Sequence, residues 1–132
     1  MRSIPVGAKG TFSLVAGPEH LASQFKDAIL PPVFATPMMI LAMENAALNA
    51  IRDFLEPGES AVGTDVSVRH LAPTPVGHKV SAEAVVTEID GRRVAFNVVA
   101  RDEAEEIGRG THERMVVDLG RLGDRLAAKR KP

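Results

Sequence analysis

One carboxylate lies where the sequence pattern predicts an apolar interior. The helical neighbours of Glu44 at i−4, i−3, i+3 and i+4 are all apolar, namely Ile40, Leu41, Ala47 and Leu48. Burying an ionised carboxylate is costly unless it is paired, and such surroundings raise a carboxyl pKa. Glu44 is therefore either an acid–base group in a functional site or one half of a salt bridge between helices or subunits.

A histidine is also predicted to lie among apolar residues, in this case in a strand. Alternation over residues 64–72 puts His70 on the apolar face, opposite the polar residues Asp65, Ser67 and Arg69. A core histidine hydrogen-bonded to backbone is the structural alternative. Burying two polar side chains in one small core is costly, and a single site shared by Glu44 and His70 would offset the cost for both.

A hydroxyl stands at the predicted start of the helix. Thr36 precedes Pro37, which is typical of a threonine N-cap followed by proline at the first helical position. A hydroxyl there also lies beside free N–H donors that can stabilise an anion. Thr36 and Glu44 are separated by about 12 Å of helix rise. A substrate, His70 or a subunit partner must therefore connect them.

Two further residues are candidates for holding a ligand. Gly63 would let backbone N–H groups approach a carbonyl closely, although a simple turn or bulge is the alternative. Arg114 shares a strand face with His112 and could bind a carboxylate or pair with Glu44. A surface salt bridge is the alternative for Arg114.

The elements that must position these residues are one long helix and several strands. Residues 37–54 contain no internal Gly or Pro, and the first seven are apolar on every side, which predicts a helix buried nearly all round. A short helix is expected at 19–28. Strands are expected at 11–16, 62–72, 78–89, 92–102 and 106–118, and Asp90-Gly91 suits a two-residue type I′ turn. The pattern predicts an α+β hotdog fold, a curved antiparallel sheet wrapped around one long central helix, and a homodimer.

Composition narrows the function classes. The 132 residues fit one domain, 1–132, with a short basic tail from about residue 119. A net charge of −1 argues against nucleic-acid binding, and the absence of cysteine excludes disulfides and thiolate catalysis. The four histidines show no spacing typical of a metal site. No apolar run is long enough for a membrane span or a signal peptide, so we expect a cytoplasmic protein.

The order and spacing of several short motifs resemble the fluoroacetyl-CoA thioesterase-like branch of the hotdog superfamily, from about residue 5 to 118. The motifs are 33–37 (VFATP), 43–44 (ME), 55–59 (LEPGE), 63–64 (GT), His70, 74–75 (TP), 91–93 (GRR) and 107–114 (IGRGTHER).

This resemblance implies a homodimeric hydrolase of short acyl-CoA thioesters that needs no cofactor apart from the CoA of its substrate. It assigns catalysis to Thr36, Glu44 and His70, with Gly63, His70 and Arg114 contacting substrate. Either Thr36 or the Glu44 carboxylate attacks the carbonyl or activates water, and His70 assists proton transfer or polarises the acyl end. An acyl-enzyme and direct hydrolysis both fit, and the sequence leaves open an oligomer larger than the dimer.

One segment departs from the family pattern. Asp27 and Leu30 stand where the fluoroacetate-specific member carries lid phenylalanines, and Phe25 is out of register with them. The acyl group is therefore left open. Two other functions stay as alternatives: a non-catalytic acyl-CoA binding module, and a hotdog enoyl-CoA hydratase or dehydratase.

Overall fold

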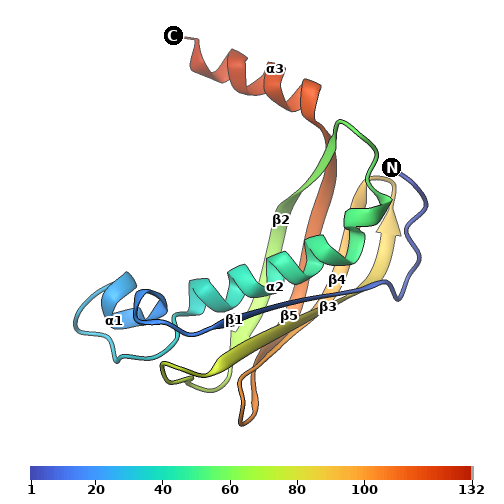
Figure 1. Ribbon diagram of the computed structural model, residues 1–132. Coiled ribbons are helices and arrows are strands. Elements are labelled where there is room, and N and C mark those ends of the chain that lie inside the picture. Colours follow the sequence, from blue (N-terminus) through green and yellow to red (C-terminus); the bar gives the residue numbers. More distant parts are fainter. Residues whose placement is uncertain (132) are drawn as a thin grey trace.

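A five-stranded antiparallel sheet curls around one long helix in the computed structural model, which describes residues 1–131 (Figure 1). The strand order is β1-β3-β4-β5-β2. The strands are β1 (Lys9–Val15), β2 (Glu59–His70), β3 (Lys79–Asp90), β4 (Arg93–Arg101) and β5 (Glu106–Asp118). This is the predicted hotdog architecture. No helix within residues 1–131 is long and apolar enough to cross a membrane.

The central helix α2 (Thr36–Ile51) packs on the concave face of the sheet through small side chains. Its buried residues recur with helical spacing: Met39, Ala42, Met43, Ala46, Ala47, Ala50 and Ile51. The approach to β1 is so close that a Cβ at Gly10 would overlap the backbone of Ala46 and Ala50. The many alanines therefore let the helix lie directly against the sheet.

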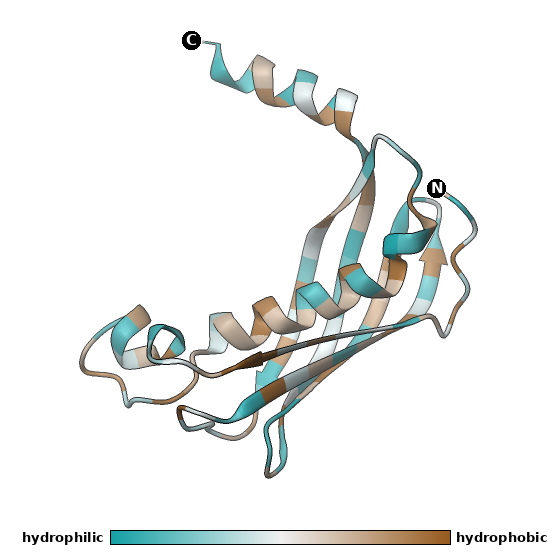
Figure 2. Ribbon diagram, viewed as in Figure 1, coloured by the Kyte–Doolittle hydropathy of each residue, from teal (hydrophilic) through white to brown (hydrophobic). Residues whose placement is uncertain are grey.

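The expectation that α2 is buried on every side is wrong for the single chain. Pro37 and Leu41 are exposed, Leu41 to 39%, and Met38 is half-buried. The sheet covers one side of the helix, and on the other side Pro37, Met38 and Leu41 line an open cavity together with Phe25. Figure 2 shows α2 mostly in pale and brown tones, interrupted by teal bands of hydrophilic residues.

The order of strands differs from a simple meander. Only β3, β4 and β5 follow one another side by side, whereas β2 lies beyond β5 and β1 beyond β3, so both are edge strands. The tight turn also lies one residue later than expected. Asp90 pairs with Arg93, and the loop is Gly91-Arg92. Gly91 has φ +60 and Arg92 does not have a positive φ, which is typical of a type II′ rather than a type I′ turn.

The segment before α2 is less helical than predicted. Instead of one helix at 19–28, it forms a 3-10 turn η1 (Pro18–His20) and a single α-helical turn α1 (Ala22–Phe25). A bridge between Leu21 and Phe34 closes the intervening loop and leads the chain into α2.

Two further helical elements follow α2 and β5. A 3-10 turn, η2 (Arg52–Phe54), ends α2. The basic tail forms a helix, α3 (Leu119–Arg130), which extends away from the sheet and has no buried residue (Figure 1).

Candidate functional site

Pairing between β2 and β5 determines which residues face α2. Gly63 pairs with Arg114, and Val66 pairs with the buried His112. Between these pairs the register shifts at a bulge that leaves Thr64 unopposed. Residues directly opposite in antiparallel strands point to the same face, so both Gly63 and His70 lie on the inner face.

The predicted N-cap role of Thr36 is wrong. Ala35 is the N-cap, Thr36 is the first helical residue, and no side chain caps this end of α2. The Thr36 hydroxyl instead lies 2.8 Å from Nδ1 of His70. The structure therefore brings together two of the three predicted catalytic side chains.

The environment of His70 suits a proton acceptor. Burial lowers its pKa from 6.5, and Nε2 is buried without a hydrogen-bond partner in residues 1–131. A neutral ring can accept the Thr36 proton at Nδ1. Both residues line a cavity of about 330 Å³, together with Val33, Leu71, Ala72 and Pro73.

Glu44, Gly63 and Arg114 form a second cluster. Arg114 Nη1 lies 3.7 Å from Glu44 Oε2. A Cβ on residue 63 would lie 2.8 Å from the same carboxylate oxygen, so glycine leaves the space that Glu44 occupies. Arg114 and Glu44 line a cavity of about 540 Å³ with Phe25, Pro37, Met38, Leu41 and Asn45.

Glu44 is less enclosed than its apolar neighbours predict. Its side chain is 40% exposed, whereas that of Arg114 is only 10% exposed. The guanidinium is held from the strand side, because its Nη2 donates to the Ala61 carbonyl at 2.7 Å and its Nη1 lies 3.2 Å from His112 Nε2. Arg114 is therefore a buried cation aimed at an open cavity, and the surface salt bridge weighed above does not apply.

The two clusters are not joined within one chain. Among the described residues, no hydrogen bond or ion pair links Thr36 or His70 to Glu44 or Arg114. The backbone carbonyls of Ala61 and Asp65 hold the side chains of Arg114 and His112. These two contacts could not be predicted from the sequence, because every residue has a backbone carbonyl.

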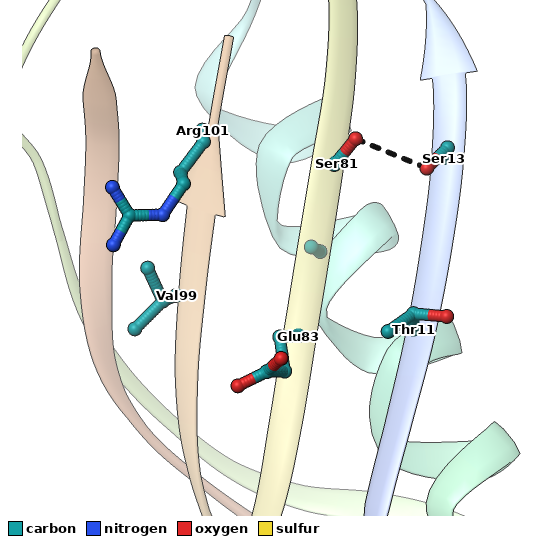
Figure 3. Close-up of a pocket in the computed structure, with 7 residues that line it drawn as sticks. Thr11, Ser13, Ser81, Glu83, Val99 and Arg101 are labelled. Carbon is teal, nitrogen blue, oxygen red and sulfur yellow. Dashed lines mark hydrogen bonds between the residues drawn. The ribbon is translucent and has the colours of Figure 1, made fainter.

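A third hollow, of about 490 Å³, lies on the sheet face turned away from α2 (Figure 3). It is lined mainly by exposed side chains of β1, β3 and β4, including Thr11, Glu83 and Arg101, and Ser13 and Ser81 hydrogen-bond across it. It contains none of the predicted site residues.

A curled antiparallel sheet around one helix, with inward threonine, histidine, glutamate and arginine, places this chain among the hotdog-fold thioesterases. Residues 17–119 match the model of the fluoroacetyl-CoA-specific thioesterase family. The chain therefore belongs to the fluoroacetyl-CoA-specific thioesterase family.

Known proteins similar to this chain agree with that membership. A fluoroacetyl-CoA thioesterase of Streptantibioticus cattleyicolor is 39% identical over 129 residues, covering 94% of this chain and 93% of that protein. A solved structure of the fluoroacetyl-CoA thioesterase FlK superposes with a TM-score of 0.90 at 36% identity, covering 98% of this chain and 99% of that one. A thioesterase superfamily member from Thermus thermophilus gives 0.92 at 32% identity, covering 98% and 96%.

Proposed function

We propose that this protein hydrolyses a short acyl-CoA thioester to the free acid and CoA, with Thr36, His70 and Glu44 as catalytic residues. The observation that carries the proposal is the 2.8 Å contact between the Thr36 hydroxyl and Nδ1 of His70 inside an open cavity. A hydroxyl paired with an unprotonated imidazole is the arrangement that activates an oxygen nucleophile. Membership of a thioesterase family supports the thioester carbonyl as its target.

The chemistry follows from the two clusters. His70 accepts the Thr36 proton as the hydroxyl oxygen attacks the carbonyl, the thiolate of CoA leaves, and water then hydrolyses the acyl-threonine ester. Glu44 and Arg114 supply an ion pair at the second cavity, where Glu44 orients the water and Arg114 holds the acyl end together with Gly63. The reaction needs no cofactor besides the CoA of the substrate.

The acyl group that we propose is small. The second cavity is bounded by Phe25, Met38 and Leu41, which offer an apolar wall, and by Asn45 and Arg114. Phe25 is half exposed at this wall, whereas Asp27 is exposed and hydrogen-bonds the backbone of Ile29. The wall therefore has one aromatic ring and no second ring at residue 27. This arrangement supports a short acyl group broader in type than fluoroacetyl.

We propose that the enzyme is a homodimer built across β2 and the uncovered side of α2. The edge strand β2 has unpaired backbone groups on one side, and its Val62 and Val66 are 38% and 39% exposed. Leu41 of α2 is also 39% exposed. A second copy would cover these residues and join the two clusters into one site. Sedimentation at micromolar concentration should give twice the 14.1 kDa of one chain. A monomer would refute this arrangement. We place the dimeric enzyme in the cytoplasm, as one domain of residues 1–132.

The test of the catalytic proposal is thiol release from a panel of short, branched and aromatic acyl-CoAs. Thr36→Val keeps the side-chain shape but removes the hydroxyl, so kcat should fall by roughly 10²- to 10⁴-fold with the thermal unfolding temperature nearly unchanged. Glu44→Gln should also lose turnover while still binding CoA. An acyl-threonine adduct on residue 36 should be visible by mass spectrometry after rapid quenching.

Three results would contradict the proposal. Absence of thiol release from every acyl-CoA tested would exclude a thioesterase. Water addition to an enoyl-CoA without thiol release would assign a hydratase instead. Acyl-CoA affinity that survives in Glu44→Gln, with no turnover in either protein, would indicate a binding module.

A further inference from the structure

His112 is a buried polar residue for which the proposed reaction has no role. It lies on β5 at 2% exposure, and its ring stacks on Phe96 with centroids 5.8 Å apart and planes 23° apart. Both ring nitrogens have neighbours within hydrogen-bond distance, one on each side of the ring. A fully buried imidazole with two such contacts has a single orientation and a single tautomer.

The partners determine that tautomer. Arg114 Nη1 lies 3.2 Å from Nε2, and because a guanidinium can only donate, Nε2 must accept and carry no proton. Nδ1 lies 2.8 Å from the carbonyl oxygen of Asp65, which can only accept, so Nδ1 must carry the proton. His112 is therefore neutral and protonated at Nδ1. Burial, which lowers its pKa from 6.5, acts in the same direction.

The bulge in β2 makes this bridge fit. The register shift between Gly63 and Asp65 puts Gly63 opposite Arg114 and Val66 opposite His112. A Cβ at residue 63 would lie 3.4 Å from Cε1 of His112, so the imidazole packs directly against this position of β2. His112 thus connects the backbone of β2, at the Asp65 carbonyl, to the guanidinium of Arg114 on its own strand β5.

Arg114 depends on few contacts. Its guanidinium has two hydrogen-bond partners, the Ala61 carbonyl at 2.7 Å and His112 Nε2, while Nε is buried without one in residues 1–131. The ion pair with Glu44 is longer, at 3.7 Å. Without His112 the guanidinium would keep one hydrogen bond, to the Ala61 carbonyl, and the longer ion pair with Glu44. Its Nη1, which faces Glu44, would then lose its closest partner.

We propose that His112 is a positioning residue: as the neutral Nδ1–H tautomer, it holds the Arg114 guanidinium against Glu44 in the acyl-CoA site. The inference rests on the proposed function, since Glu44 and Arg114 are taken to act on the thioester. A protonated ring would turn an N–H toward the guanidinium, leaving two donors without an acceptor between them. The charge state of His112 therefore determines where Arg114 lies.

Two amide substitutions separate this role from simple packing. Glutamine places its carbonyl oxygen near the position of Nε2 and can still accept from Arg114, whereas asparagine reaches only the position of Nδ1. We expect His112→Gln to keep kcat/KM within roughly tenfold of the unmodified protein, and His112→Asn to lose roughly 10²-fold, as expected for a displaced positioning group. A purely structural histidine would show equal losses in the two variants, and that result would overturn the proposal.

A second measurement does not depend on activity. Imidazole ¹⁵N NMR of the full-length protein at neutral pH should show one histidine protonated at Nδ1 only, and this signal should vanish in His112→Gln, which assigns it. An Nε2–H tautomer or an imidazolium at His112 would overturn the proposal. If the unmodified protein released no thiol, the proposed function would fail, but the spectrum would still decide whether His112 accepts from Arg114.

Discussion

Gly63→Ala adds one methyl group at the point where Glu44, His112 and Arg114 meet. The new Cβ would lie 2.8 Å from Glu44 Oε2, 3.4 Å from His112 Cε1 and 3.7 Å from Arg114 Nη1. The φ angle at residue 63 is not positive, so alanine brings no backbone strain. The perturbation is therefore steric, and only the contact with Glu44 is too short.

The structure gives the size of the effect. Ordinary contact begins near 3.4 Å, so the carboxylate must retreat by about 0.6 Å. The Glu44 side chain is 40% exposed and can move at little cost, so the free energy of unfolding should change by less than about 1 kcal/mol. Displacement on that scale lowers the rate of an oriented reaction by roughly 10- to 10²-fold, or about 1.4 to 2.7 kcal/mol in the barrier.

The assay measures kcat/KM by thiol release and stability by thermal unfolding, for Gly63→Ala beside Gly123→Ala. Residue 123 lies in α3, and a Cβ there meets nothing within 4 Å. The control should keep full activity. Unchanged kcat/KM in Gly63→Ala would show that the space beside Glu44 has no catalytic purpose. A large loss of stability would show that the carboxylate cannot yield.

Two further predictions concern stability. Gly10→Ala should destabilise the fold by about 3 kcal/mol or more in urea unfolding, because its Cβ meets the backbone of α2 at Ala46 and Ala50; a loss below about 1 kcal/mol would show that β1 can move away from the helix. Burial lowers the pKa of His70 and of His112 in the folded protein below 6.5. As the pH falls below about 6.5, these histidines therefore take up protons in the unfolded chain before they do so in the folded one. The stability that is present above this pH is lost as the pH falls through the folded pKa values. The thermal unfolding temperature should therefore drop between about pH 7 and pH 5, before carboxylates titrate, and should drop less in His70→Gln; equal drops in both proteins would contradict this assignment.

The long helix and the strands could be predicted because their signals are local. Residues 37–54 contain no Gly or Pro after the initial Pro37, and the turn near Gly91 needs a residue that accepts positive φ. Strand order carries no such local signal. The placement of β2 beside β5 depends on pairing between residues such as Gly63 and Arg114, which are far apart in the chain.

The apolar side of α2 shows the limit of pattern reading. Leu41 belongs to a run that is apolar on all sides, and the run predicts burial without saying what does the burying. In the single chain the sheet covers one side only. Hydrophobic periodicity reports how much apolar surface must be covered, and it does not distinguish the chain itself from a second copy.

The sequence alone determined which chemical groups are available to a site: a carboxylate at Glu44, an imidazole at His70, a hydroxyl at Thr36 and a cation at Arg114. Their grouping was decided by the tertiary structure. Strict alternation would put residues 63 and 70 on opposite faces, and the bulge at Thr64 puts them on the same one. The hydroxyl of Thr36 contacts His70 across 34 residues of sequence. Residue type fixes the chemistry that a side chain can perform, but long-range pairing fixes its neighbours, and a bulge of one residue reverses every face assignment beyond it.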